Sequence, residues 1–218
     1  MKAVIVALVL GGWALAASAY AAPVTISMEG AIETLAPVLP PDALEIGETV
    51  HFEVTYDTNA VDLDSQDQFF SIVPLELNVS LPGLGLEFVE QVSSSRIRGI
   101  NNFLNGDQIV LSGSFDFRAA GAPMVGGKSI NGFTLTLSDQ SATVLSDDGF
   151  GVLQDLSLSD FDTLSFILIV AENTPDVTDR HITGSISSLT VSAVPIPGAL
   201  ALMAPALILL HRRRRRSS

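Results

Sequence analysis

Five oxygen-bearing side chains in one short segment offer the sharpest candidate chemistry in this sequence. Asp57, Asn59, Asp62, Asp64 and Asp67 all fall within residues 57–67, in a predicted loop. Calcium takes about six to eight oxygen ligands, and a loop can bring such side chains together with backbone carbonyls. The spacing is not that of an EF-hand, because the sixth position lacks glycine and the twelfth lacks glutamate. The segment predicts a calcium site, with an ordinary acidic loop between strands as the alternative.

The sequence gives little support for nucleophilic catalysis or for a zinc site. The histidines are His51, His181 and His211, of which the last belongs to a basic C-terminus. His51 and His181 lie on the polar faces of predicted strands, without a Gly-x-Ser-x-Gly turn and without the spacing of a zinc site. We therefore expect two surface histidines. Cysteine is absent, which excludes disulfides and thiolate chemistry.

Paired carboxylates could hydrolyse glycosidic bonds, and the chain has 24 acidic residues. This abundance makes any one pair uninformative, since every acidic β protein offers such pairs. The single tryptophan, Trp13, lies in the first apolar stretch, so an aromatic sugar platform would depend on Tyr56 and the phenylalanines. A secreted polysaccharide hydrolase is thus a lesser alternative, and we expect the protein not to be an enzyme.

The acidic charge is concentrated in the middle of the chain. All 24 acidic residues lie there against five basic ones, a balance of −19. The five are Arg96, Arg98, Arg118, Lys128 and Arg180. Such a surface repels nucleic acid and anionic lipid headgroups, so no nucleic-acid partner is expected. It suits solubility or the binding of divalent cations.

Residues 1–21 have the pattern of a secretory signal peptide. Lys2 precedes an apolar stretch from Ala3 to Leu15, and two overlapping Ala-x-Ala sites follow. We place the cleavage site at Ala19 and Ala21, with the cut after Ala21. An uncleaved N-terminal anchor is the alternative.

The C-terminus has the pattern of a stop-transfer segment. A proline motif from Val194 to Gly198 leads into an apolar stretch that ends at Leu210, and a block of arginines follows. The positive-inside rule keeps that block cytoplasmic, so the central domain lies across the membrane. Ile196 to Leu210 would span about 22 Å as a helix, against a hydrocarbon core of about 30 Å. The predicted transmembrane helix is therefore a marginal anchor; the alternative is a buried strand with a basic tail.

This tail resembles the PEP-CTERM/VPLPA-CTERM sorting signal. The matching residues are Val194, Pro195, Pro197 and Gly198, and Arg212, Arg213, Arg214, Arg215 and Arg216 match the basic stop of the family. Ile196 stands where the commonest form has glutamate, and the VPLPA-type variant has an apolar residue there. The resemblance implies recognition by exosortase, a membrane-embedded cysteine protease that handles surface proteins of Gram-negative bacteria, often those that make exopolysaccharide.

Between the two ends, apolar and polar residues alternate as in β-strands. The clearest cases are Phe52–Tyr56, Ile109–Phe117 and Phe133–Leu137. Further strands are expected near residues 24–34, 70–80, 84–93 and 181–193, with Pro74 placing the second of them at an edge or a bulge. The segment from Leu164 to Val170 is apolar on both faces and predicts a central, covered strand. Residues 22–193 thus predict an all-β, antiparallel β-sandwich, jelly-roll-like, and residues 194–218 the sorting signal.

The family resemblance extends loosely into this domain. Its elements are a strand end at Val54–Asp57, a turn at Asn102–Asp107, a strand at Leu135–Asp139 and a closing strand at Gly184–Thr190. They imply a fold and carry no established activity.

Together these features predict a non-enzymatic exported protein. It would be an inner-membrane-anchored precursor sorted by an exosortase-like protease, and then a cell-surface or extracellular-matrix component associated with the envelope or exopolysaccharide. A calcium-assisted, lectin-like carbohydrate-binding module is the first alternative.

Overall fold

The computed structural model describes residues 23–64, 69–89, 95–103, 106–115, 124–145, 153–171 and 180–194. Residues 24–192 form one compact unit. Its elements are β1 (Val24–Thr34), β2 (Thr49–Tyr56), β3 (Phe69–Ile72), β4 (Glu76–Leu81), the 3-10 helix η1 (Pro82–Leu84), β5 (Leu86–Val89), β6 (Arg96–Phe103), β7 (Gly106–Ser114), β8 (Met124–Val125), β9 (Lys128–Asp139), the 3-10 helix η4 (Leu158–Asp160), β10 (Thr163–Val170) and β11 (His181–Ala193).

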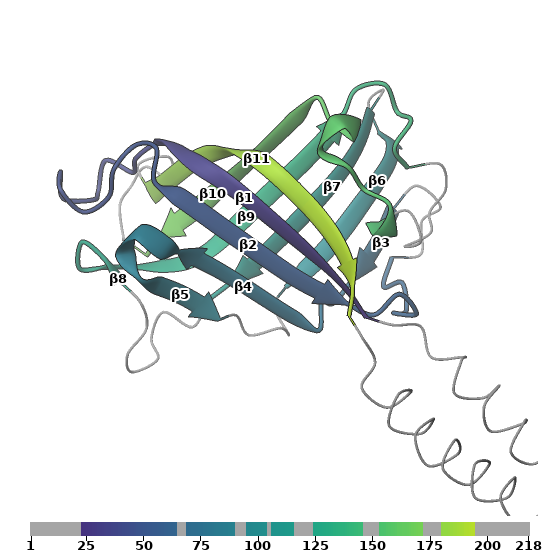
Figure 1. The fold of residues 1–218 in the computed structure, drawn as a ribbon, viewed down its shortest axis with the longest axis horizontal. Coiled ribbons are helices and arrows are strands. Elements are labelled where there is room, and N and C mark those ends of the chain that lie inside the picture. Colours follow the sequence, from purple (N-terminus) through teal and green to yellow (C-terminus); the bar gives the residue numbers. More distant parts are fainter. Residues whose placement is uncertain are drawn as a thin grey trace, which may run out of the picture. The chain divides into compact units, whose positions relative to one another are not determined.

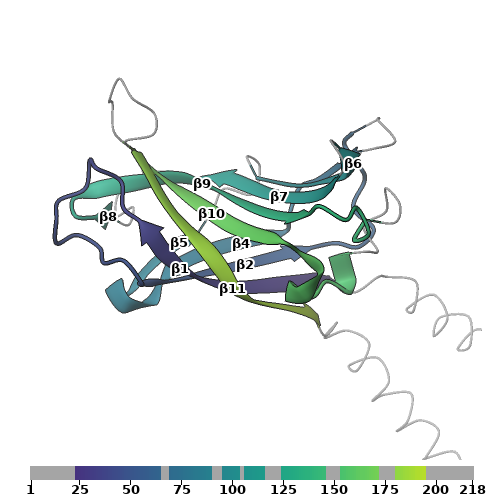
Figure 2. The ribbon, with the colours of Figure 1, turned by 90° about the horizontal axis from the view of Figure 1, so that it is seen from above.

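All the strands belong to one continuous sheet that curls over on itself. The strand order is β3-β6-β7-β9-β10-β11-β1-β2-β4-β5, with β8 paired to β9 beside this path. Every strand pair whose register is resolved is antiparallel. Figures 1 and 2 show the result as two facing layers, with β11 running between them. The apolar faces of the two layers enclose the core.

The prediction of an antiparallel all-β fold is confirmed, but the two layers are not the separate sheets of a sandwich. β11 is hydrogen-bonded to β10 in one layer and to β1 in the other, so the ladder is not interrupted between them. The jelly-roll-like order is also wrong. Most neighbours in the sheet are consecutive in the chain, as in β9-β10-β11 and β4-β5, so the sheet is built largely from hairpins.

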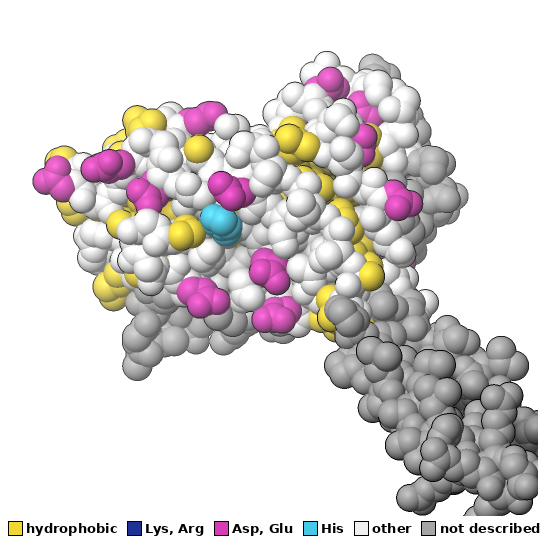
Figure 3. Space-filling view, in the orientation of Figure 1, with side chains coloured by type: hydrophobic (Ala, Val, Ile, Leu, Met, Phe, Trp, Pro, Cys, Tyr) yellow, Lys and Arg dark blue, Asp and Glu magenta, His cyan; other side chains and the backbone are white. Residues whose placement is uncertain are grey.

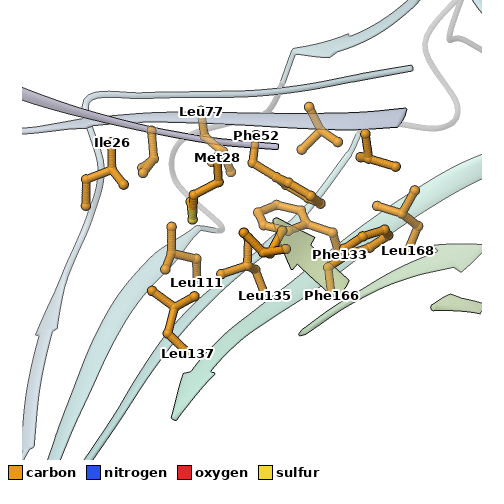
Figure 4. Packing of buried hydrophobic residues seen from close by; sticks show 14 of the residues in the cluster. Ile26, Met28, Phe52, Leu77, Leu111, Phe133, Leu135, Leu137, Phe166 and Leu168 are labelled. Atoms are coloured by element: carbon orange, nitrogen blue, oxygen red, sulfur yellow. The ribbon is translucent and has the colours of Figure 1, made fainter. Parts of the chain in front are cut away.

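The alternating segments bury the residues that the sequence predicts. Phe52, Val54 and Tyr56 on β2 are at most 1% exposed, as are Phe133, Leu135 and Leu137 on β9. Phe52 joins the two layers, because its ring centroid lies 5.9 Å from that of Phe133 and 5.2 Å from that of Phe166 on β10. Figure 4 shows these three rings meeting between the layers. Such aromatic contacts add to the hydrophobic stabilisation of the core.

Leu164–Val170 was predicted to be a central, covered strand; its central position is confirmed, but its full coverage is not. It forms the central strand β10, between β9 and β11. Phe166, Leu168 and Val170 are buried, but the side chains that alternate with them, including Ile167 and Ile169, are only partly buried. The outer face of β10 is therefore covered only in part.

Residues 70–80, expected as one strand, form two. β3 ends at Ile72 and β4 begins at Glu76. β3 is one end of the strand order and pairs with β6, whereas β4 is next to the other end and pairs with β2. Pro74 lies between them and has no N–H to donate to a ladder, so the chain leaves one layer there and joins the other. β3 is an edge strand, as Pro74 led us to expect for this segment.

The neighbouring strands β1 and β11 approach each other closely, and glycine occupies both strands there. A Cβ atom on Gly184 would lie 2.1 Å from the carbonyl oxygen of Ala31 and 2.5 Å from Cζ of Phe166. A Cβ atom on Gly30 would lie 2.4 Å from the carbonyl oxygen of Ser185. Both positions thus require a residue without a side chain.

We predict that Gly184→Ala destabilises the domain by about 1–3 kcal/mol, the range typical of overpacked core positions. The added methyl group must push β1 and β11 apart or displace the ring of Phe166. Urea denaturation of this variant and of Ser188→Ala, an exposed position on the same strand, would measure the difference. Equal midpoints for the two variants would contradict the close approach.

Candidate functional site

The predicted calcium loop follows β2, and its described carboxylates accept hydrogen bonds from the backbone. The Asp57 Oδ1 accepts the N–H of Asn59 at 2.8 Å. The Asp62 Oδ1 accepts the N–H of Asp64 at 2.9 Å and the N–H of Ser71 at 2.8 Å. These bonds fold the segment locally, as Asx turns do.

Asp62 also protects a sheet edge. Ser71 lies on the edge strand β3, whose sheet neighbour is β6. On the open side of β3, Asp62 accepts the Ser71 N–H, and the Ser71 carbonyl accepts the N–H of Leu63 at 2.8 Å. The loop thus occupies backbone groups that an edge strand would otherwise offer to another chain.

The calcium site stays a prediction. Within the described ranges, no three His, Asp or Glu side chains are grouped so that they could hold a metal ion. Asp67 lies outside the described residues. The hydrogen bonds of Asp57 and Asp62 described above use only their Oδ1 atoms, so they do not by themselves exclude these residues as ligands.

A second group of aspartates lies where β7 and β9 meet, and no chemical motif in the sequence marks it. Asp107 and Asp139 are paired across these strands and are both buried. Asp139 accepts hydrogen bonds from the Ser141 hydroxyl at 2.6 Å and from the N–H groups of Ser141 and Thr143, each at 2.8 Å. Asp107 Oδ2 accepts the N–H of Leu145 at 2.7 Å. The two carboxylates therefore fix the backbone that follows β9.

These hydrogen bonds hold Asp139 in its ionised form. The Ser141 hydroxyl, followed by the backbone N–H of Thr143, lowers the pKa of Asp139 from 3.8 to about 2. A carboxyl group with such a pKa has no proton to donate near neutral pH, which disfavours Asp139 as a general acid in glycoside hydrolysis. In the sequence, Asp139 stood out only as the end of Leu135–Asp139, a segment that loosely resembles the family, and that resemblance implied a fold but no chemical role.

A hollow of about 530 Å³ lies beside Asp139 and is lined by three further carboxylates, those of Asp155, Asp160 and Asp162. Asp160 accepts the N–H of Ser157 at 2.7 Å and closes a capping box at the start of η4. Asp162 accepts the N–H of Gln140 at 2.8 Å. Asp160 and Asp162 therefore hold backbone groups in place, whereas no such bond is described for Asp155; Asp155 and Asp162 are both exposed.

Tyr56 does not belong to a sugar-binding surface. Its side chain is fully buried, and its hydroxyl has no hydrogen-bond partner among the described residues. Burial raises the pKa of the Tyr56 phenol far above its ordinary value, and the negative charge of Asp155 adds to this effect. Tyr56 is therefore a neutral core residue, which corrects the suggestion that it could form an aromatic platform.

The two histidines of the domain lie on the outside of the sheet, as predicted. His51 on β2 is about half exposed, and its Nε2 lies 3.7 Å from Glu29 Oε2 on β1. A hollow of about 410 Å³ beside it is lined by Glu53, Asn78 and Glu87 among others. His181 is partly buried at the start of β11, opposite Ile169. No direct contact between the histidines is seen in the described part of the chain.

Figure 3 shows the face of the molecule that carries β1, β2 and β11. Carboxylates are scattered over it with one histidine, and no Lys or Arg side chain is visible. This agrees with the acidic surface expected from the composition.

Of the sorting motif, only its first residue is described. The N–H of Val194 donates to the carbonyl oxygen of Pro23 at 2.7 Å, so the residue directly before β1 and the one directly after β11 are adjacent. The described residues do not include the rest of the motif, the predicted cleavage site or the basic stop, namely Pro195, Ile196, Pro197, Gly198, Ala19, Ala21 and Arg212–Arg216. Within the described ranges, no helix has the length and hydropathy needed to cross a membrane.

Comparison of this chain with known proteins gave no match. No family model, no curated protein and no solved structure matches it.

We predict that Asp62→Ala destabilises the domain by about 1–3 kcal/mol, because two N–H groups lose their acceptor. The loss should be the same in EDTA and in millimolar calcium, since the role of Asp62 at the edge of β3 needs no ion. Thermal denaturation of both proteins in both buffers provides the measurement. A calcium-induced rise in the midpoint of the wild type that Asp62→Ala abolishes would instead support the calcium site.

We also predict that the stabilising effect of Asp139 disappears in acid. The folded-state pKa of about 2 lies below the unfolded value of 3.8, so the contribution is complete above about pH 4 and is lost as the pH falls toward 2. Urea denaturation should show Asp139→Asn to be less stable than the wild type at pH 7 and nearly equal to it near pH 2. The exposed Asp155→Asn serves as the control, and a pH-independent deficit in Asp139→Asn would rule out this account.

Proposed function

We propose that this protein is an exported envelope or surface component, made with a signal peptide and sorted through its C-terminal tail by an exosortase-like protease. The central domain is the cargo, a non-enzymatic part of the cell surface or of an extracellular matrix associated with exopolysaccharide. A short helix that ends in five arginines holds the precursor in the inner membrane until processing.

The observation that carries the proposal is the order of features at the C-terminus. A Val-Pro-Ile-Pro-Gly motif, a short apolar segment and five consecutive arginines follow one another within residues 194–216. Each feature alone is weak, but their coincidence directly after the last strand of the domain is specific. The apolar segment is too short for a firm anchor, which suits a segment that needs to hold only until it is cut.

The fold is compatible with such a route. β1 and β11 are neighbours in the sheet, and they run antiparallel, since Ser187 on β11 contacts Glu29 while Thr183 contacts Thr34. The chain therefore enters the domain and leaves it at the same end of the sheet. A leader before β1 and a tail after β11 can thus reach one membrane surface without crossing the folded domain.

The proline motif begins where the sheet hydrogen bonds end. Val194 still donates its N–H to Pro23, but Pro195 and Pro197 have no N–H with which to extend a ladder. Proline also favours an extended conformation in the residue before it, here Val194 and Ile196. A sequence of this kind favours the extended backbone that a protease active site accepts.

The described surface suits a cargo domain more than a catalytic one. The carboxylates of Asp57, Asp62, Asp107 and Asp139 all accept backbone hydrogen bonds, and so do those of Asp160 and Asp162. Their role is to hold loops and strand ends in place. The remaining acidic side chains keep an exported domain soluble through mutual repulsion.

The full chain with both Pro195→Ala and Pro197→Ala should keep its C-terminal tail in its native cells, because the protease no longer finds the motif. Intact-mass measurement of protein from the membrane and from the surface would show an unprocessed, membrane-retained species in place of the shorter mature form. The matched control is Pro40→Ala with Pro41→Ala, a proline pair in the loop before β2. Normal processing and surface yield of the motif variant would contradict the proposal.

A further inference from the structure

The second half of β11 has a sheet neighbour on only one side. β10 pairs with β11 up to Ser165 opposite Ser185, and β10 itself begins at Thr163. From Ser188 onward β11 therefore extends past the start of β10, whereas β1 still lies on its other side, where the Ser187 hydroxyl contacts the carbonyl oxygen of Glu29 at 3.3 Å. The described residues place no strand on the free side of Ser187–Ala193.

This half of the strand also changes the face that it turns to the core. In the first half, Ile182, Gly184 and Ile186 are buried, all at even positions. Ser187 and Ser188 are both exposed, and after them the odd positions Leu189 and Val191 are the ones that pack partly against the core. None of the residues from Ser187 to Ala193 is buried. The segment is thus a partly apolar strand edge that is exposed to solvent.

The other two edges of the sheet are protected, but this one is not. The loop at Asp62 and Leu63 covers β3, and β5 is four residues long and carries Glu87. Charged residues, short strands and covering loops are the usual means by which edge strands avoid pairing with other chains. From Ile182 to Val194 the chain has no charged residue and no proline. Its edge therefore lacks the features that would keep a second strand away.

The charge of the domain indicates which strand this edge fits. With 24 acidic residues against five basic ones, two copies repel each other over most of their surface. They can approach most closely where both are neutral, and β11 is such a place. In Figure 3 a line of hydrophobic side chains follows the region that β11 occupies in Figure 1, with carboxylates on either side. A cationic partner would be drawn to those carboxylates and not to the neutral strand.

We propose that Ser187–Ala193 of β11 pairs with the same segment of a second copy of this chain, which joins two domains into one continuous sheet. A symmetric pair that uses the same edge on both sides has to be antiparallel, since only a two-fold axis perpendicular to the strands sets donors opposite acceptors. Centred on Thr190, this pairing places Leu189 of each copy opposite Val191 of the other. Cross-strand aliphatic pairs of this kind stabilise antiparallel sheets.

The absence of cysteine gives a direct test. Thr190→Cys in the full chain should form a disulfide-linked dimer under mild oxidation, because residues opposite each other on antiparallel strands are close enough to be bridged. Leu84→Cys, an exposed position in η1 beside β4 and β5 at the far end of the strand order, is the matched control and should remain largely monomeric on a non-reducing gel. Equal yields for the two variants, no dimer, or a Thr190→Cys adduct with a different protein would each overturn the proposal.

A second variant tests the same edge without cross-linking. Thr190→Glu puts two like charges face to face across the axis and should weaken the dimer Kd at least roughly tenfold, as measured by light scattering of the full chain in detergent. Leu84→Glu adds the same charge at the far end of the strand order and should leave the Kd nearly unchanged. Raising the salt concentration should tighten the wild-type dimer, because it screens the repulsion between the acidic domains. Equal effects of the two substitutions would exclude β11 as the contact.

Neither readout depends on export or sorting, so the two proposals can fail separately.

Discussion

The structure depends on the close approach of two backbones, those of β1 and β11. One sheet can bury its whole apolar face only if it folds over until that face meets itself, and the strand at the fold must pair with both layers. β11 does so, and the glycines at positions 30 and 184 leave room for the neighbouring carbonyl oxygens and for the ring of Phe166. Once β11 is in place, Phe52 reaches Phe133 and Phe166 from the opposite layer, and the core closes.

The same geometry explains why so many aspartates sit at strand ends. A sheet that curls leaves N–H groups without ladder partners wherever the chain turns out of a layer, and a carboxylate next to the turn can accept several of them. Asp139 accepts from three residues, and Asp62 links a loop to the edge of β3. Much of the acidity that first suggested metal binding or hydrolysis is therefore part of the folded framework.

The periodic features of the fold could be predicted from the sequence, and the long-range ones could not. β1 and β11 have the expected boundaries, and the alternation in β2 and β9 identified the buried side chains, because period-two patterning is a local property. The pairing of β11 could not be predicted in this way, because nothing within residues 181–193 indicates that one strand pairs with both layers. Pro74 signalled a break in regular pairing, but it could not indicate that β3 and β4 would join different layers. Asp62 likewise stood out in the sequence as a possible calcium ligand. Its role at the edge of β3 could not be predicted, because its partner Ser71 lies outside the loop.

The β1–β11 pairing has one more consequence, which concerns how this domain can be combined with others. The amide of Val194 and the carbonyl of Pro23 are 2.7 Å apart, so the domain begins and ends almost at one point. A unit with adjoining ends can be spliced into a surface turn of a host protein with little strain on the host backbone, or its ends can be joined and its chain reopened elsewhere. The single new chain break of such a circular permutant would affect only the loop in which it falls, so the order of strands along the gene is less essential than their order in the sheet.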